Sequence, residues 1–472
     1  MLKKITINTI IYGIGPQLPK FANLLILPLI TPFLTTVDFG IYGVSQAYVL
    51  LFQNLKTLGL DAILVNSYVK RPKLFRPIWQ VLFGVMIINS IILSLLLAIV
   101  LYFSFREEVG DDILSFILLN CIPLMLFSSA EVIYFRLYQL KENASAGSGR
   151  IVLAGAVNVF ITYYGIVYLN LDYMGWIWAL FLSGLTSFLV SIYPIWKEKI
   201  FPVFKLKLTI VRGSLSISMP LIPHYYSRFI LNSSDRLIFD ILEQDVNRVG
   251  LYNAAYSIGN YYNIVTTAFK RAVSPTVVKL LKKNNLESIN TLKKIFSLFS
   301  TILLALTFIS SIWSKEIIFL LFKNDSFQDI YYVTIWIFMT YNYLPIHMSA
   351  HQVMVFHEKT SQLWLRAVIA IFFNTILNFT LIPIFGVNVA VIVSFCSYYI
   401  MALSTYTLSD FKDIKMVLMP PLKWCLFTIV LTIMALFVVD YSQFFKLLIS
   451  IAVLISVLLF LSRRISLLNF KV

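Results

Sequence analysis

Apolar segments of eighteen or more residues recur from one end of this chain to the other. A helix of that length crosses the roughly 30 Å hydrocarbon layer of a bilayer. Backbone groups in lipid must find their hydrogen-bond partners within the protein, which restricts spanning segments to helices and closed barrels. The segments are continuous rather than alternating, which favours helices. With only 13% charged residues to make a polar exterior, the sequence predicts an all-α polytopic membrane protein rather than a soluble domain.

The apolar segments define fourteen predicted spans. We place them at 5–34, 39–68, 77–104, 112–139, 151–170, 174–195, 212–240, 247–278, 293–313, 327–356, 361–383, 386–408, 416–439 and 443–462. With loops assigned to alternate sides, most Lys and Arg residues fall on the side that holds both ends of the chain. The positive-inside rule then predicts cytoplasmic termini. A missed span would scramble this bias, so the bias supports the count.

Several classes of function are excluded. The basic residues behind the net charge of +16 lie in short loops between spans, which argues against a nucleic-acid partner. The three cysteines fall inside apolar segments, so we interpret them as small buried residues. No phosphate-binding loop, nucleophile elbow or zinc-protease motif is present, so we expect no cofactor. His347 and His351 have the i, i+4 spacing of metal ligands. No third ligand accompanies them, so we predict no metal site.

An internal repeat divides the chain. The second span begins Phe39-Gly40-Ile41-Tyr42 and the eighth begins Val249-Gly250-Leu251-Tyr252. Because the copies lie six spans apart, the two halves share one orientation, as in transporters with parallel repeats. Chance similarity of a short string is the alternative. The repeat predicts four regions: a six-helix lobe at 1–197, a cytoplasmic linker at 198–211, a second six-helix lobe at 212–410, and two additional helices at 411–472.

Cationic residues lie deep within three predicted spans. Lys20 and Arg228 occupy similar depths in the first and seventh spans, and Lys56 lies closer to the cytoplasm in the second. An ionised side chain at the centre of a bilayer costs about 2.5–3.5 kcal/mol on insertion scales, so each must face protein or water. The residues predict a basic cavity. The alternative is internal pairing, of Arg228 with Asp235 and of Lys56 with Asp61.

Polar residues form stripes at helical spacing in three spans. A helix packed wholly in lipid gains nothing from such a stripe, which marks a face turned to a cavity or to a partner helix. We favour the cavity. The candidate residues are Gln46 and Gln53 in the second span, His224, Arg228 and Asn232 in the seventh, and Asn253, Asn260 and Arg271 in the eighth.

Acidic residues within the spans are candidates for ion coupling. Asp61, Glu131 and Asp235 could each carry a coupling proton or form an ion pair. For Glu131, the pairing candidates in the sequence are Arg136 and Tyr134. The residues alone do not decide between these roles.

The order of several short motifs resembles that of the Wzx-type polysaccharide flippases. This family lies within the multidrug/oligosaccharidyl-lipid/polysaccharide superfamily of MATE-like fold. The resemblance covers about residues 5–410. The motifs are Leu27-Pro28-Leu29, Asp38-Phe39-Gly40-Ile41-Tyr42, Ser218-Met219-Pro220-Leu221-Ile222-Pro223, Ser234-Asp235-Arg236, Val249-Gly250-Leu251-Tyr252-Asn253-Ala254-Ala255-Tyr256, Ser274-Pro275, and Asn374-Thr375-Ile376-Leu377-Asn378 with Ile382-Pro383 and Gly386.

The resemblance implies a multi-pass protein of the bacterial inner membrane that moves an undecaprenyl-diphosphate-linked oligosaccharide to the outer leaflet by alternating access. Such transport serves the synthesis of O-antigen, capsule or exopolysaccharide. A cavity that holds Lys20, Lys56, Arg228 and Arg271 would complement the anionic diphosphate. Candidate partners are a polysaccharide polymerase, a chain-length regulator and a coupling cation, H⁺ or Na⁺.

Three alternative functions remain open from the sequence. A multidrug extruder of the same superfamily exports cations and should present acidic cavity residues, whereas the central charges here are mostly basic. A membrane glycosyltransferase or polymerase typically carries a large external loop, which this chain lacks. A non-transporting scaffold of a polysaccharide assembly is the third. The sequence therefore favours a transporter over an enzyme.

Overall fold

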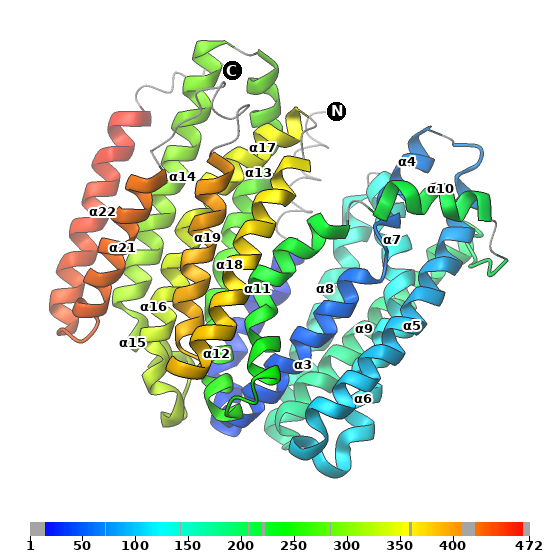
Figure 1. Ribbon diagram of the computed structural model, residues 1–472, viewed down its shortest axis with the longest axis horizontal. Helices are drawn as coiled ribbons and strands as arrows, with labels where there is room; N and C mark the ends of the chain where they lie inside the picture. The colour runs from blue at the N-terminus through cyan, green and yellow to red at the C-terminus, as the bar shows by residue number, and fades with distance from the viewer. Residues whose placement is uncertain are drawn as a thin grey trace. The chain divides into compact units, whose positions relative to one another are not determined.

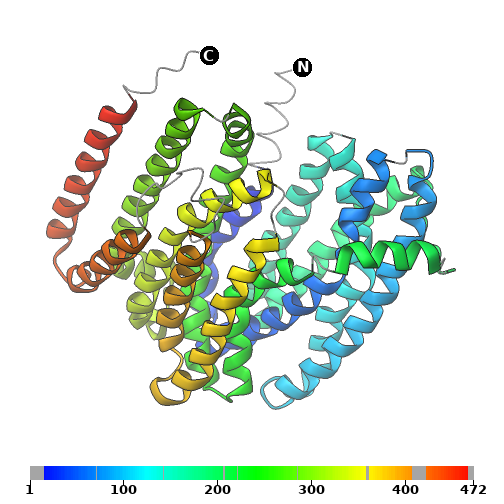
Figure 2. The same cartoon turned by 45° about the horizontal axis from the view of Figure 1, so that its top comes forward.

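The computed structural model describes residues 15–70, 72–141, 143–205, 208–219, 222–283, 285–357, 361–406 and 421–465. Within these ranges the protein contains helices, turns and short connections, and no strand (Figures 1 and 2). The chain forms two compact units, Met1–Gly250 and Leu251–Val472, and each is described separately.

The N-terminal unit contains helices up to the start of α12. They are η1 (Gly15–Gln17), α2 (Leu18–Ile30), η2 (Thr31–Phe33), α3 (Thr36–Leu55), α4 (Leu60–Lys70), α5 (Phe75–Val109), η3 (Gly110–Asp112), α6 (Ile113–Ile122), η4 (Pro123–Phe127), α7 (Ser128–Leu140), α8 (Ala144–Tyr163), η5 (Tyr164–Tyr168), α9 (Asp172–Lys197), α10 (Leu208–Ser218), α11 (Ile222–Ile241) and the first turn of α12 (Val246–Gly259), which continues into the C-terminal unit after Gly250.

The C-terminal unit contains the remaining helices. They are α13 (Tyr261–Lys283), α14 (Leu286–Ile312), α15 (Ser314–Leu321), η7 (Asp325–Ile330), α16 (Tyr331–Thr340), η8 (Tyr341–Tyr343), α17 (Leu344–Phe356), α18 (Ser361–Phe385), α19 (Val389–Tyr406), α21 (Pro421–Val438) and α22 (Gln443–Ile465).

Each of the fourteen predicted spans coincides with one or more of these helices. By length and composition, six helical stretches in the described residues could cross a membrane, or seven if the bent pair α3 and α4 forms one span. Shorter apolar helices lie at Leu18–Phe33, Val389–Thr405 and Leu422–Val438. The helical character of the spans is confirmed, and the number of membrane crossings stays a prediction.

The two glycines of the predicted repeat pack reciprocally in the N-terminal unit. A Cβ atom on Gly40 would collide with the carbonyl oxygen of Val246, and one on Gly250 would collide with the carbonyl oxygen of Thr36. Thr36 and Val246 each lie four residues before their own glycine. Each glycine therefore packs against the residue that lies four positions before the other glycine. This exchange of partners is the pattern that a local two-fold axis between the first turns of α3 and α12 produces. A hydroxyl hydrogen bond from Thr36 to the side-chain oxygen of Asn247, 2.6 Å long, reinforces the contact.

Helices α2 and α8 run parallel and pack closely. In order along the two helices, Gly15 packs against Ser148, and Pro19 packs against Gly155. Next, the Asn23 amide donates to the Asn158 side-chain oxygen at 3.3 Å. The predicted first and fifth spans cross in the same direction, so this parallel packing agrees with the predicted order of spans.

The segment after α9 is tied to α5. The backbone N–H of Val203 donates to the Gln80 carbonyl at 3.0 Å, and the Gln80 amide donates to the Lys199 carbonyl at 2.8 Å. Helix α10 begins at Leu208, within the stretch expected to be the inter-lobe linker. The boundaries of the predicted lobes stay a prediction.

The two predicted additional helices, α21 and α22, pack against α14 in the C-terminal unit (Figure 1). The Trp424 indole donates to the Asn342 carbonyl at 2.9 Å. Lys446 of α22 is 1% exposed and lies 2.7 Å from Glu316. At the turn between α21 and α22, Asp440 accepts hydrogen bonds from Lys315, Tyr331 and Tyr332. These polar contacts fix the position of the helix pair on its unit.

Glu198, directly after α9, links two basic side chains at the end predicted to be cytoplasmic. It accepts hydrogen bonds from Lys141 and from Arg76, the latter at 3.1 Å. The hydrogen bond from Lys141 lowers the pKa of the Glu198 carboxyl below its usual value, and the Arg76 bond acts in the same direction. The ion pairs therefore favour the folded state only while Glu198 is ionised.

We expect Glu198→Gln to lower the unfolding temperature at neutral pH. A lowered folded-state pKa contributes stability above the unfolded pKa of about 4.3 and loses it as the pH falls through the folded value. The difference in unfolding temperature between wild type and variant, measured in detergent from pH 7 to pH 3, should shrink below about pH 4.5. Glu107→Gln, at an exposed carboxylate with no ion pair in the described residues, is the control. A pH-independent difference for Glu198→Gln would contradict the prediction.

We expect Gly250→Ala to destabilise the protein, because its methyl group would push apart the first turns of α3 and α12. Overpacking of this kind costs typically 1–3 kcal/mol. Gly213→Ala is the matched control, since a Cβ on Gly213 in α10 meets no atom within 4 Å. Alanine there should be neutral or stabilising by up to about 1 kcal/mol. Thermal unfolding in detergent measures both, and equal effects would refute the close approach.

Candidate functional site

The predicted second span is broken between α3 and α4. The two helices meet at an angle of 42°. Leu58 and Gly59 have φ values of 50° and 71°, in the left-handed region that ends helices. The Asn89 amide donates to the carbonyl oxygens of Leu55 (2.9 Å) and Lys56 (3.0 Å). The carbonyls exposed by the break are therefore satisfied, which a break within a membrane requires.

Lys56 lies at the C-terminal end of α3, where this break begins. The free carbonyls at a helix C-terminus carry partial negative charge, which favours a cation. The helix break therefore explains part of the stability of a half-buried lysine in an apolar span. Lys56 also lies within electrostatic reach of Glu131 and Arg150.

Arg150 of α8 is the centre of a buried charged cluster. Its side chain is 9% exposed and lies 3.5 Å from the Glu131 carboxylate of α7. The guanidinium lies over the Tyr134 ring at 5.1 Å and donates a hydrogen bond to Ser187 of α9. Its Nε is buried and has no hydrogen-bond partner in the described residues. Lys56 and Arg150 are thus two cations close to one carboxylate.

The remaining acidic candidates occupy separate places. Asp61 of α4 forms an ion pair with Arg136 of α7, rather than with Lys56. Arg136 also donates to Gln139 at 2.8 Å. Asp235 is fully buried within α11. The coupling roles of Asp61, Glu131 and Asp235 stay predictions.

The polar candidates of the N-terminal unit are distributed over three helices. Gln46 of α3 donates to the Asn120 side chain of α6 at 3.2 Å. Gln53 is half-buried on α3, and Lys20 is exposed on α2. The carbonyl of Asn232 in α11 accepts a hydrogen bond from Arg236 at 3.0 Å. Among these candidates, the structure joins Gln46 to a neighbouring helix by a side-chain hydrogen bond.

Other candidates lie in the C-terminal unit or outside the described side chains. Asn253 is buried and Asn260 exposed, with the Asn260 side chain accepting from Asn263 at 3.1 Å. The side chains of His224, Arg228 and Arg271 lie outside the described part of the structure, although their helices are included. In the described residues, no group of three or more His, Cys, Asp or Glu side chains could hold a metal.

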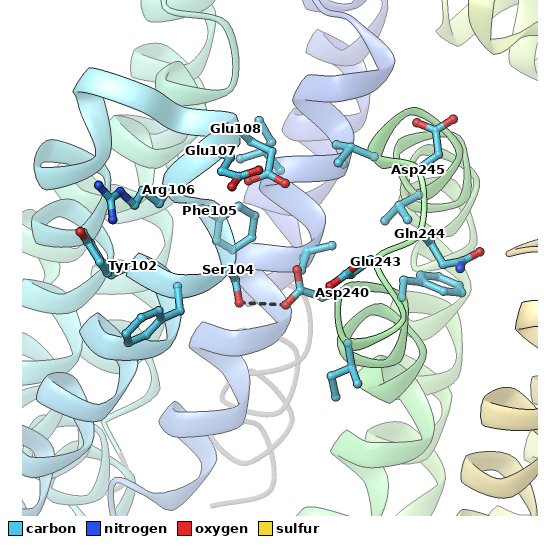
Figure 3. A pocket seen from close by; sticks show the side chains of 18 residues that line it. Tyr102, Ser104, Phe105, Arg106, Glu107, Glu108, Asp240, Glu243, Gln244 and Asp245 are labelled. Carbon is cyan, nitrogen blue, oxygen red and sulfur yellow. Dashed lines mark hydrogen bonds between the residues drawn. The ribbon is translucent and has the colours of Figure 1, made fainter.

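A second polar site lies at the predicted outer end of the N-terminal unit. Asp240 of α11 accepts hydrogen bonds from Tyr48 of α3 (2.5 Å) and Ser104 of α5 (2.8 Å). Figure 3 shows the adjoining cavity, of about 800 Å³, with acidic side chains from α5 and from the α11–α12 connection. Its charged lining residues are Arg106, Glu107, Glu108, Asp240, Glu243 and Asp245.

Sequence reasoning missed three of these residues. Arg150 is close to a basic loop and was assigned to the cytoplasmic charge bias. Asn89 lies within a mostly apolar span and belongs to no polar stripe that the sequence analysis identified. Asp240 stands at the edge of the predicted seventh span. Their sequence signal is a polar side chain within an apolar segment or at its edge.

The fold is similar to that of known transporters. A MATE multidrug-resistance transporter of the MOP superfamily in the inward-facing conformation matches with a TM-score of 0.55 at 14% identity, over 88% of this chain and 96% of that one. A MOP superfamily transporter from Pyrococcus furiosus matches with a TM-score of 0.55 at 13% identity, over 88% and 94%. The bent form of the Vibrio cholerae MATE transporter VcmN matches with a TM-score of 0.53 at 12% identity, over 88% and 98%.

These similarities define an all-helical, multi-span membrane protein of MATE-like transporter fold, which confirms the predicted fold class. Residues 3–281 match the family described as polysaccharide biosynthesis protein. The chain therefore belongs to the polysaccharide biosynthesis protein family, and the resemblance found in the sequence is confirmed at this level. A comparison with curated protein sequences finds no match.

We expect Glu131 and Arg150 to be coupled in stability. Glu131→Gln leaves two partly buried cations uncompensated, and Arg150→Gln removes the cation that Glu131 contacts. Breaking a buried ion pair by removing one partner can cost 3–5 kcal/mol. The double variant should be less destabilised than the sum of the single variants, by about 1–3 kcal/mol. Unfolding measurements on all four proteins test the cluster, and strict additivity would contradict it.

Proposed function

We propose that this protein is a flippase that moves a lipid-linked oligosaccharide repeat unit across the bacterial inner membrane. The substrate class is an undecaprenyl-diphosphate-linked saccharide destined for surface polysaccharide, whether O-antigen, capsule or exopolysaccharide. Membership of a polysaccharide biosynthesis family with a transporter fold supports the general function. The observation that carries the finer proposal is the surplus of positive charge around Arg150.

A diphosphate carries negative charge that needs charge-assisted hydrogen bonds inside a membrane. Lys56 and Arg150 supply two cations, and Glu131 neutralises one of them. The unpartnered Nε of Arg150 leaves a donor to be satisfied. Lys20, Arg228 and Arg271 are further candidate contacts on α2, α11 and α13. Gln46, Gln53 and the asparagines Asn232, Asn253 and Asn260 are candidates for hydrogen bonds to sugars.

The charge distribution also supports a direction of transport, from the cytoplasmic to the outer leaflet. The cavity next to Asp240 is lined mostly by acidic side chains, whereas the Arg150 cluster is basic. With the termini in the cytoplasm, the acidic cavity lies at the outer end. An anionic headgroup would be attracted to the cluster and held only weakly in the outer cavity, so a headgroup that reaches the outer cavity would leave it readily.

The polarity of the binding pocket varies among transporters of this fold. The Pyrococcus furiosus transporter is described as having a binding pocket of reverse polarity that suggests a different function. A multidrug extruder of cations is the competing function, and the basic cluster counts against it. A glycosyltransferase or polymerase would need catalytic machinery on a fold that is otherwise that of transporters. Association with a polymerase, a chain-length regulator or a coupling cation remains part of the proposal.

We expect Lys56→Gln and Arg150→Gln to reduce transport in a deletion strain of the native host. Losing one hydrogen bond to a charged group costs about 1.5–3 kcal/mol, which corresponds to roughly 10–100-fold weaker binding. Surface polymer should fall while the lipid-linked repeat unit accumulates in the inner leaflet. Arg228→Ala and Arg228→Lys extend the test to the seventh span.

Controls separate charge from folding. Lys56→Arg and Arg150→Lys keep the charge and should restore more polymer than the glutamine variants at equal expression. Arg212→Gln removes an exposed cation of α10 and should have no effect. If deletion leaves the polymer unchanged and instead makes the strain sensitive to cationic drugs, the flippase proposal is wrong and extrusion replaces it.

A further inference from the structure

An apolar groove of about 500 Å³ runs between α2 and α8 in the N-terminal unit. Apart from the Tyr163 hydroxyl, its side chains are hydrocarbon. The lining residues are Leu18, Pro19, Ala22, Ile26, Leu29, Val152, Gly155, Ala156, Val159, Phe160 and Tyr163.

The sequences of the two helices produce this groove. The lining positions recur at intervals of one to four residues on each helix, so they form one face of each. The contact of Gly155 with Pro19 and the hydrogen bond of Asn23 with Asn158 hold the helices together beneath the groove. Ala22 and Ala156 are too small to fill it. Along α2 the lining extends from Leu18 to Leu29, which corresponds to roughly 16 Å.

The opposite faces of these helices carry cations. At 100° per residue, Lys20 lies about 150° around α2 from the middle of the groove-lining positions. Arg150 lies about 150° around α8 from the middle of its own groove-lining positions. The α2–α8 pair therefore separates an apolar face from a face that bears Lys20 and Arg150. This is the complement of a molecule with an anionic head and a hydrocarbon tail.

We propose that the α2–α8 groove binds part of the polyisoprenoid tail of the lipid-linked substrate. The inference rests on the proposed function, which supplies the tail, and adds its location. The groove begins at Leu18 and Pro19, in the same helical turn as Lys20. A diphosphate held on the cationic side thus has its tail pass around the first turn of α2 into the groove.

Selection of this tail over ordinary lipid comes from shape. Transfer of a tail from bilayer to groove gains little hydrophobic free energy, because lipid chains are as apolar as the protein. Dispersion contacts instead favour a chain that fills the groove without voids. Methyl branches at regular intervals distinguish an isoprenoid from a straight acyl chain, and the small side chains of Ala22 and Ala156 leave space for them in the groove.

Filling the groove tests the proposal. Ala156→Trp places a large ring in the groove at a position with an exposed side chain, where the fold should tolerate it. Leu25→Trp is the matched control, since Leu25 lies on the same stretch of α2, is 75% exposed and does not line the groove. Purified variants in proteoliposomes would be assayed with two diphosphate-linked saccharides, one with a full-length polyprenyl tail and one with a tail of three isoprene units.

We expect Ala156→Trp to lose several-fold in apparent affinity for the long-tailed substrate, with the short-tailed substrate unaffected. Leu25→Trp should match wild type for both. Equal loss for both substrates, or no loss for either, would overturn the groove assignment. If wild type moves neither substrate, the proposed flippase function fails instead.

Photolabelling gives a readout that does not depend on transport or on the tryptophan variant. A photoreactive polyprenyl diphosphate should label wild-type residues on α2 and α8, and Ala156→Trp should reduce this labelling while Leu25→Trp does not. Equal labelling of the groove by a photoreactive straight-chain phospholipid would mean that the groove holds bulk lipid, and would refute the proposal.

Discussion

Hydrocarbon offers a polypeptide no hydrogen-bond partner, and the described structure follows from that constraint. In the N-terminal unit, three irregular segments show how backbone groups stay paired. Asn89 accomplishes this at the end of α3 by donating to two carbonyls. At Pro123 and at Tyr164 the helices continue as short π-helical segments instead of opening. Breaks of this kind provide irregular geometry without unsatisfied backbone, and irregular segments in membrane transporters are where substrates and ions bind.

The same constraint governs the charged side chains. Asp61 with Arg136 and Lys446 with Glu316 are paired one to one. The cluster around Arg150 differs, because Lys56 and Arg150 share Glu131. An excess cation in an apolar interior costs free energy, and binding of an anion at the site would offset that cost. The broken end of α3 compensates part of that cost through its carbonyl dipoles, so the cluster and the helix break are one arrangement.

Prediction from the sequence succeeded where the signal was local. Apolar length located the helices. The motif around Gly40 and Gly250 identified two glycines that pack reciprocally, while the repeat of whole lobes stays a prediction. Prediction of a side chain's partner failed where that partner depends on which helices are neighbours. Glu131 contacts Arg150 rather than Arg136 or Tyr134, because α7 turns that residue towards α8. Periodicity fixes the direction of a side chain on its own helix, but not the partner that lies opposite. Asp240, which meets Tyr48 and Ser104 from two other helices, was missed for the same reason.

Helix α8 unites the two halves of the proposed substrate site. Its buried face presents Arg150 to Glu131 and Ser187, while its groove face presents Gly155 and Ala156. A lipid-linked saccharide requires this division, because its head must leave the hydrocarbon and its tail must not. Two faces of one helix keep both environments at a fixed separation. In the proposed alternating access, the polar path for the head would therefore open and close without displacing the tail from its groove.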